Sequence, residues 1–358
     1  TNNDYLILKK CIKSEYISSV GRYVDNFENE INKYTGAKYT VCTVNGTSSL
    51  HIALKVVGVK ENDEIIMPSL SFVAPANASK YLNATPNFVD ISLDDLSICP
   101  KKLYKYLSSI SQTKNGFTYN KITKKRISAI VLVHVYGLPS NSLAIKKIAN
   151  KFNIKLVEDA AEGLGSFSKN RHVGTIGDIG ILSFNGNKII STGGGGAILT
   201  NNINYARKAK YLTTVAKAKN KFRFIHTEVG FNYRMPNINA ALGCSQIKNL
   251  NLLIKKKLKI HEKYKEIFEK DHNFILLNTK NENKSNYWLN TIILKKANKK
   301  HIDLITKFFD KQGIAVRPCW NLLSSLPYLK NSPKDDLSNS IKMANSIINL
   351  PSSPSLIK

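Results

Sequence analysis

The stretch Asp178–Thr200, DIGILSFNGNKIISTGGGGAILT, decides the fold because it sets one lysine between two apolar runs. The first run ends at Ser183 and Phe184, and the second follows the four glycines Gly193–Gly196. Both runs have the length and composition of buried strands. The polar turn between them presents Lys188. A lysine on a tight turn between buried strands is a fixed amine and not a swinging surface charge.

The position of Lys188 has a chemical consequence. Desolvation lowers the pKa of a lysine and favours the free amine that forms a Schiff base. Ser183, five residues upstream, could offer a hydroxyl to a phosphate beside the same lysine. A surface lysine in a glycine-rich hairpin explains the segment equally well when the segment is taken alone. The spacing is not that of a Walker A loop, because Asn187 separates Gly186 from Lys188.

Length and composition place the chain among ordinary globular proteins. Its 358 residues can bury one large core and usually a second, smaller one, and 42% of them are hydrophobic. No apolar run approaches the roughly 20 residues of a membrane helix, and the N-terminus lacks a signal-peptide core. Five scattered cysteines without a CxxC pair argue against disulfides and zinc. We therefore expect a cytoplasmic protein with no membrane association and no metal site.

The formal charge of +28 is the composition's most unusual feature. It is compatible with nucleic-acid binding, but the lysines are spread along the chain and no recognised nucleic-acid motif is present. We expect a solvated basic surface and no nucleic-acid partner. An alternative is that the charge attracts an anionic nucleotide substrate.

Strands alternate with helices through the first two thirds of the chain, which predicts a mainly parallel sheet covered on both faces. The segment 112–126 is polar and is predicted to be a loop. The expected strands lie in the segments 37–44, 64–68, 86–90, 127–137 and 154–166, and the strand in the last segment ends on Glu158 and Asp159.

The remainder of the chain has the pattern of a separate small α/β domain. A long basic helix at roughly 247–271 leads to the strand NYWLNTIILKK, a helix at 301–312 and the strand GIAVRPCW. We therefore expect a large domain over residues 1–245 and a small C-terminal domain over residues 246–358.

Several chemically capable residues fall at or just beyond the carboxyl ends of the predicted strands, where ligands of parallel sheets sit. Gly46, Thr47 and Ser48 open a helix directly after a strand, so free N–H groups, hydroxyls and the helix dipole converge on a possible phosphate. The others at such ends are Phe72, His134, Asp159 and Lys188.

A lysine for a Schiff base, a phosphate cup, an aromatic to lie on a ring and a strand-end carboxylate together indicate pyridoxal phosphate. The carboxylate keeps the pyridinium nitrogen protonated, so that the ring can accept electrons. Asp159, at the end of an apolar strand, is expected to be buried. Alone, Asp159 reads as a helix cap and Phe72 as a core aromatic. Asp159 and Lys188 together, 29 residues apart, favour the cofactor.

The sequence resembles the DegT/DnrJ/StrS family of nucleotide-sugar aminotransferases over nearly its whole length. The motifs that carry the resemblance are FENEINKYTG, VNGTSSLHIAL, PSLSFVAPANA, VHVYGLP, EDAAEGLGS, HVGTIGDIGILSFNGNKIISTGGGG and GFNYRMPNINAALG. The resemblance implies the aspartate-aminotransferase-type fold (fold type I), pyridoxal 5'-phosphate or its amine form as cofactor, a homodimer with a shared active site, and L-glutamate as amino donor.

The resemblance also implies roles for individual residues. Lys188 matches the Schiff-base lysine and proton shuttle, and Asp159 matches the partner of the pyridine nitrogen. Glu162 stands near the cofactor's 3-hydroxyl, and Phe72 matches the aromatic that stacks on the ring. The implied phosphate contacts are Gly46, Thr47, Ser48 and Ser183, with Asn232 reaching the phosphate from the partner subunit.

Three further residues match family positions on the substrate side without a firm role: His134, Arg234 and Arg317. For the two arginines, structural salt bridging is an equally good explanation.

Within the family, the chain is similar to a branch that aminates carbon 4 of nucleotide-linked 2-acetamido-4-keto-6-deoxy sugars, for legionaminic-type or bacillosamine-type pathways. The segments behind this are SFNGNKIISTGGGG, NGFTYNKITKKR, KFRFIHTEVGFNYRMPN, RPCWNLL and INLPSSP. The GDP-perosamine branch ranks second, because it typically has Glu where this chain has Gly195. A 3-keto aminotransferase remains an alternative. Lys188 argues against the sugar dehydratases that carry His there, and the retained site argues against a non-catalytic regulator.

Overall fold

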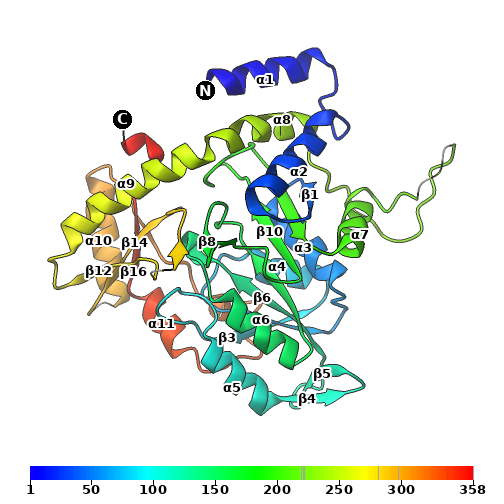
Figure 1. Ribbon diagram of the computed structural model, residues 1–358. Coiled ribbons are helices and arrows are strands. Elements are labelled where there is room, and N and C mark those ends of the chain that lie inside the picture. The colour runs from blue at the N-terminus through cyan, green and yellow to red at the C-terminus, as the bar shows by residue number, and fades with distance from the viewer. Residues whose placement is uncertain (219, 221, 281, 297, 358) are drawn as a thin grey trace.

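A computed structural model describes the whole chain except residues 219, 221, 281, 297 and 358 (Figure 1). Its centre is a seven-stranded sheet in which the neighbours from β10 to β3 pair in parallel, whereas β11 is antiparallel to both strands beside it. In spatial order the strands are β1 (Tyr39–Thr43), β11 (Gly196–Thr200), β10 (Ile179–Ser183), β7 (Lys155–Asp159), β6 (Ile127–Val133), β2 (Glu64–Pro68) and β3 (Thr85–Val89).

The strands are apolar on both sides because helices cover both faces of the sheet. In β6, alternate residues enter two different cores: Ala129 and Val131 pack on one face, and Ile130 and Leu132 on the other. The first core contains residues of α3 (Gly46–Val56), α4 (Ala74–Tyr81) and α7 (Ile203–Thr213). The opposite face is covered by α2 (Arg22–Thr35), α8 (Asn237–Gln246), α5 (Pro100–Ile110) and α6 (Ser142–Lys151).

A second sheet lies at the other side of the molecule and is antiparallel at every pairing. Its spatial order is β12 (Phe274–Leu276), β14 (Asn290–Leu294), β16 (Ile347–Leu350) and β15 (Arg317–Pro318). The accompanying helices are α9 (Leu250–Phe268), which runs on from α8 toward this sheet, α10 (Lys299–Lys311) and α11 (Ser338–Ala344), while α1 (Asn2–Lys13) lies near the N-terminus (Figure 1).

The two sheets share apolar contacts. Trp288, Ile293 and Ile347 belong to the same core cluster as residues of β2 and β6. The expected domain boundary between residues 245 and 246 falls at the end of α8. Because the core is continuous across it, the division into two domains stays a prediction.

The sequence predicts a loop over the polar segment 112–126, and this prediction is wrong for part of the segment. It contains a hairpin of β4 (Ser111–Lys114) and β5 (Phe117–Asn120). Asn115 and Gly116 at its tip have φ of 51° and 75°, the left-handed pair that a tight hairpin turn requires. A short third sheet contains β13 (Asn283–Lys284), β8 (Phe167–Ser168) and β9 (Arg171–His172).

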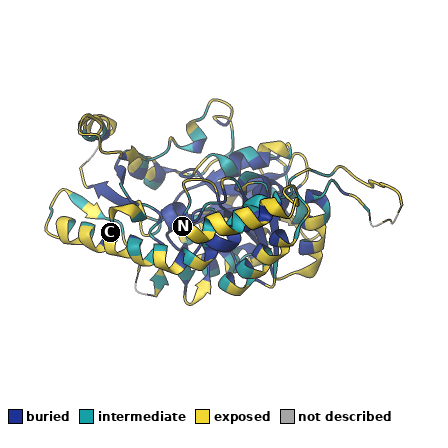
Figure 2. Ribbon diagram, turned by 90° about the horizontal axis from the view of Figure 1, so that it is seen from above, coloured by how far each residue is buried: buried dark blue, intermediate teal, exposed yellow. Residues whose placement is uncertain are grey.

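The predicted strand GIAVRPCW shrinks to the two residues of β15, at the edge of the second sheet. Pro318 lacks the N–H that a longer ladder needs, which confines it to an edge. Burial is concentrated in the interior of the molecule, and the outer faces of the helices are exposed (Figure 2). Among the helices of the described part, none is long and apolar enough to cross a membrane.

Candidate active site

The turn that carries Lys188 is fixed by backbone hydrogen bonds at its base. Lys188 N–H donates to Asn185 O at 2.9 Å, and Phe184 N–H donates to Gly195 O at 2.9 Å. The Lys188 side chain is 13% exposed, and its Nζ lies 3.3 Å from Glu162 Oε1. The same Nζ lies 4.2 Å from the centre of the Trp288 ring. The amine is therefore held between a carboxylate and an aromatic ring.

Glu162 is itself fixed by the backbone of a strained turn. Its Oε2 accepts a hydrogen bond from Tyr136 N–H at 2.8 Å. Tyr136 has φ of 57°, in the left-handed region that a tyrosine seldom adopts. Burial raises the pKa of the Glu162 carboxyl, and the charge of Lys188 opposes that rise. The strain at Tyr136 thus directs one N–H at the carboxylate that contacts the lysine.

Asp159 is buried at the carboxyl end of β7, as predicted, with 6% of its surface exposed. Its Oδ1 accepts a hydrogen bond from Ala161 N–H at 3.0 Å. The other oxygen has no hydrogen-bond partner in the described part of the chain. Burial raises the pKa of the Asp159 carboxyl, and the hydrogen bond from Ala161 N–H and the charge of Lys188 oppose that rise. A buried carboxylate with a free oxygen fits a cationic ring nitrogen.

Hydroxyl groups gather at the start of α3, where the sequence predicts a phosphate site. Asn45 caps this helix by accepting a hydrogen bond from Ser48 N–H at 2.7 Å. A Cβ added at Gly46 would lie 2.9 Å from Ser183 Cβ, so glycine allows β10 to approach the helix start closely. Within the described residues, the hydroxyls of Thr47, Ser48 and Ser183 make no hydrogen bond. Unpartnered donors at a helix N-terminus fit a phosphate group.

Phe72 is not a core aromatic, because 52% of its surface is exposed. It follows β2 and meets Trp320 edge-on, with ring centres 6.2 Å apart. Trp320 in turn packs on Tyr136 at 4.9 Å. An exposed aromatic beyond a strand end, supported from behind, is free to cover a planar ligand.

His134 is fully buried, and both of its ring nitrogens are engaged. Its Nε2 lies 3.1 Å from Glu158 Oε2, and its Nδ1 accepts from Ser140 N–H at 3.1 Å. Burial alone would raise the pKa of the Glu158 carboxyl. Hydrogen bonds from His134, Gly177 and Ser142 outweigh burial and lower this pKa to about 2. This geometry argues against a direct substrate contact by His134. It makes His134 and Glu158 supports for the end of β7 next to Asp159.

Asn232, Arg234 and Arg317 lie apart from the Lys188 cluster in the described contacts. The Arg234 guanidinium donates twice to Asn232 Oδ1, at 3.1 Å from each nitrogen, and Asn232 is exposed. Arg317 is exposed at β15 and donates to Val316 O at 2.9 Å. Neither arginine makes an ion pair with a described carboxylate. Structural salt bridging within one chain therefore does not explain these two arginines.

Sequence reasoning missed the segment 285–288, which enters the site from the far half of the chain. Asn286 Nδ2 donates to Glu162 O at 2.8 Å and to Leu164 O at 2.9 Å. Gly137, whose φ is 84°, leaves room for the Asn286 side chain, because a Cβ on residue 137 would stand 2.1 Å from Asn286 Oδ1. Trp288 Nε1 donates to Asn187 O at 2.7 Å. The only available signal was the pairing of asparagine and tryptophan before a strand, which does not indicate where the side chains point.

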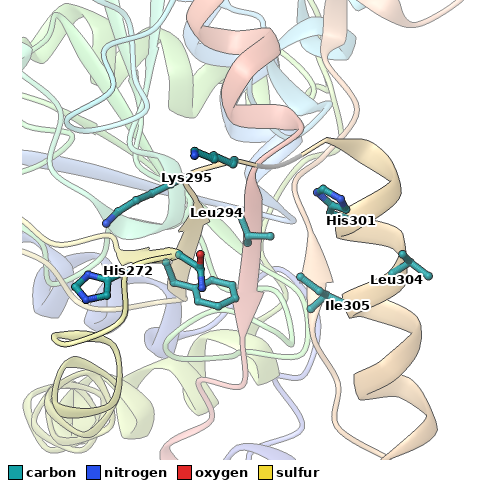
Figure 3. A pocket seen from close by; sticks show the side chains of 9 residues that line it. His272, Leu294, Lys295, His301, Leu304 and Ile305 are labelled. Atoms are coloured by element: carbon teal, nitrogen blue, oxygen red, sulfur yellow. The ribbon is translucent and has the colours of Figure 1, made fainter.

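A cavity of about 580 Å³ lies elsewhere, between β12, the end of β14 and α10 (Figure 3). None of the predicted site residues lines it. The residues labelled in the figure are His272, Leu294, Lys295, His301, Leu304 and Ile305. The cavity is therefore separate from the candidate active site.

Comparison with known proteins identifies the family of the chain. Residues 2–358 match the DegT/DnrJ/EryC1/StrS aminotransferase family. The chain is 34% identical over 360 residues to the GDP-perosamine synthase of Escherichia coli O157:H7, covering 99% of this chain and 92% of that protein. It is also 34% identical over 293 residues to the UDP-4-amino-4,6-dideoxy-N-acetyl-beta-L-altrosamine transaminase of Campylobacter jejuni strain 81-176, covering 82% of this chain and 74% of that protein.

Solved structures show the same fold. A DegT DnrJ EryC1 StrS aminotransferase from Brucella abortus matches with a TM-score of 0.89 at 22% identity, covering 100% of this chain and 92% of that one. Helicobacter pylori PseC, an aminotransferase involved in the biosynthesis of pseudoaminic acid, matches with a TM-score of 0.89 at 24% identity, covering 99% of this chain and 92% of that one.

The family match, together with the mainly parallel seven-stranded sheet that these neighbours share, defines a pyridoxal phosphate-dependent transferase of fold type I. The chain belongs to the DegT/DnrJ/EryC1/StrS aminotransferase family and is a pyridoxal phosphate-dependent sugar aminotransferase. The predictions of family, fold class, enzyme class and cofactor are thereby confirmed.

Proposed function

We propose that this enzyme transfers an amino group from L-glutamate to the 4-keto carbon of a nucleotide-linked 2-acetamido-4-keto-6-deoxyhexose carrying UDP or GDP. The product would be a 4-amino sugar for a surface glycan, of the legionaminic or bacillosamine type. The observation that carries the proposal is the amine of Lys188, held 3.3 Å from Glu162 beside the buried Asp159. The C. jejuni relative is named for a UDP-linked 4-amino-4,6-dideoxy-N-acetyl sugar, which supports the substrate class.

In this proposal, different residues would hold different parts of the cofactor. Gly46, Thr47, Ser48 and Ser183 would hold its phosphate, the free oxygen of Asp159 its ring nitrogen, and Phe72 one face of its ring. Lys188 Nζ would hold its aldehyde end. When bound, pyridoxal phosphate supplies an electron sink for charge that develops on the reacting carbon.

Lys188 would also move the proton during transfer. Its Nζ must take a proton from one carbon and return one to another, so the amine has to alternate between its charged and neutral forms. Glu162 Oε1 lies within hydrogen-bonding distance and stabilises the charged form. Because Tyr136 N–H fixes the other oxygen, Glu162 contacts the amine from a constant direction.

A GDP-perosamine synthase is the second candidate, since the E. coli relative of that name aligns over 99% of this chain. The side chains packed around Gly195 favour ranking it second. A Cβ there would lie 2.4 Å from Thr192 Oγ1 and 2.6 Å from Met235 Cε. The glutamate typical of the perosamine branch would therefore require the side chains of Thr192 and Met235 to move.

We further propose that the enzyme is a cytoplasmic homodimer whose active site is shared between subunits. Support comes from the arm formed by residues 214–233, which extends from the body beyond α7 (Figure 1). Phe224 and Val229 on the arm are 78% and 74% exposed. Lys219 and Lys221, in the arm sequence, lie outside the described residues. An exposed arm that carries aromatic side chains, with Asn232 at its base, is suited to cross to a partner's phosphate site.

One experiment tests the proposal directly. The enzyme is incubated with L-glutamate and a panel of UDP-, GDP- and dTDP-linked 4-keto-6-deoxy sugars, with and without a 2-acetamido group, and the products are identified by mass spectrometry. We expect amination of the 2-acetamido sugars. Amination of only the GDP sugar without the acetamido group would establish the second candidate instead. Absence of any amino sugar and of 2-oxoglutarate would refute both.

A further inference from the structure

Trp288, one of the two tryptophans in the chain, makes two contacts with the turn that carries Lys188. Its ring centre lies 4.2 Å from Lys188 Nζ, and its Nε1 donates to Asn187 O at 2.7 Å. The residue is 6% exposed and lies between β13 and β14, about a hundred residues from the turn. One side chain therefore contacts both the amine and the backbone that presents it.

Trp288 is itself held through both of its backbone groups. Its N–H donates to Asn286 Oδ1 at 2.8 Å, and its carbonyl accepts from Lys257 Nζ at 2.9 Å. Asn286 is anchored in turn on the carbonyls of Glu162 and Leu164. With both backbone groups engaged, the tryptophan side chain is directed at the Lys188 turn and has little freedom to leave it.

Lys257, on α9, is a buried cation that the catalytic chemistry does not use. Only 5% of its surface is exposed, and its Nζ donates to Trp288 O and to Ser352 O, the latter at 2.7 Å. No carboxylate pairs with it in the part of the chain that the structure describes. Burying an ammonium group without a counter-ion is costly, so the two carbonyl bonds are its main compensation. A lysine kept at such a cost has a positional task.

We propose that Lys257 and Trp288 are positioning residues for Lys188: Lys257 fixes the Trp288 backbone, and Trp288 fixes the 185–188 turn and the direction of the amine. In this inference, the catalytic role of Lys188 rests on the proposed function, whereas the contacts of Lys257 and Trp288 do not depend on it. It means that α9 and the second sheet determine how the first sheet presents its lysine.

Hydrogen exchange of the cofactor-free protein tests the linkage without any turnover. The reporter is the peptide spanning residues 185–188, whose Lys188 amide donates to Asn185 O. Trp288→Phe keeps a ring but removes the Nε1 donor, and Lys257→Met removes the ammonium from a chain of similar length. Since a net hydrogen bond is worth about 1 kcal/mol, we expect exchange in the peptide to rise about fivefold in each variant.

Lys255→Met is the matched control, because Lys255 is exposed on the same helix and makes no hydrogen bond or ion pair with any described residue. It should exchange like the wild type. In the assay with L-glutamate, Trp288→Phe and Lys257→Met should lower kcat about tenfold with KM nearly unchanged, since they disturb proton transfer and not donor binding. Lys255→Met should change neither.

Wild-type exchange in a Lys257→Met protein that retains its circular dichroism and melting temperature would overturn the proposal. If that variant does not fold, Trp288→Phe decides alone, and wild-type exchange there would overturn it equally. Lys188→Ala separates this inference from the proposed function. Full turnover in that variant would remove the catalytic role, whereas the exchange result would still decide whether Lys257 and Trp288 hold the turn.

Discussion

The Lys188 turn and the arm of residues 214–233 are both polar-aromatic loops, but they differ in how far the rest of the chain buries them. The Lys188 side chain is 13% exposed and contacts Glu162 and Trp288, and its backbone is held by the hydrogen bonds of the turn. On the arm, Phe224 is 78% exposed and Asn232 contacts Arg234. The comparison teaches that the Lys188 turn is enclosed by residues of its own chain, whereas the arm exposes aromatic side chains.

The base of the arm is nonetheless rigid. Phe231 and Tyr233 stack with ring centres 5.2 Å apart, and Phe231 packs edge-on against His51 of α3 at 4.8 Å. Val44 N–H also donates to Tyr233 O at 2.8 Å. Because residues 231 and 233 are anchored beside α3, Asn232 between them is presented outward in a fixed direction. Four predictions test this contrast, from the largest expected effect to the smallest.

Lys188→Ala should abolish turnover while cofactor binding persists. Loss of general acid–base catalysis alone costs about 100- to 10,000-fold, and loss of the covalent hold on the cofactor adds to that. The cup and Asp159 stay intact, so equilibrium dialysis should still detect bound pyridoxal phosphate. Turnover close to the wild-type rate would show that Lys188 is not the catalytic amine.

Asp159→Asn should keep the fold and lower kcat by far more than tenfold, a factor that corresponds to about 1.4 kcal/mol. A neutral amide cannot keep the ring nitrogen protonated, so the electron sink is weakened. Circular dichroism provides the check on folding. If the variant keeps more than about a tenth of the activity, the contact of Asp159 with Ala161 N–H would be its main role, as a cap.

Asn232→Asp should weaken cofactor binding if the arm reaches a partner's phosphate. Like charges about 4 Å apart cost on the order of 1 to 4 kcal/mol at effective dielectric constants of about 80 to 20. Mixing Lys188→Ala with Asn232→Asp subunits should restore some activity, because a heterodimer holds one intact site, and each two-fold contact occurs twice. An active monomer on size exclusion, or no restored activity after verified subunit exchange, would contradict the shared site.

Lys257→Met should change the pH dependence of stability. Burial lowers the pKa of Lys257 to about 8, so between that value and its ordinary pKa the unfolded chain binds more protons than the folded one. The stability that wild type has over the variant should therefore increase with pH, by roughly 2 kcal/mol from about pH 7 to about pH 9.5. Denaturant unfolding at the two pH values measures it, and a constant difference would mean that Lys257 titrates normally.

Residues whose role follows from local pattern could be predicted from the sequence. Strand and helix periodicity located β1, β2, β3, β6 and β7 to within a few residues, and the strand-end rule singled out Asp159 and Lys188. The glycine and hydroxyls after β1 indicated the phosphate cup for the same reason. The hairpin at 111–120 was missed, although its Asn115-Gly116 turn is a strong local signal.

The sequence by itself predicted that strands alternate with helices, and it singled out Lys188 and Asp159 as candidate catalytic residues, because each of these signals depends on neighbours within one strand–turn–helix unit. Only the tertiary structure decided that Trp288 contacts Lys188, that Lys257 holds Trp288, and that His134 is enclosed by Glu158 and Ser140. The physical reason is distance along the chain. Hydrophobic periodicity shows which face of an element is buried, but not which distant side chain is buried against it.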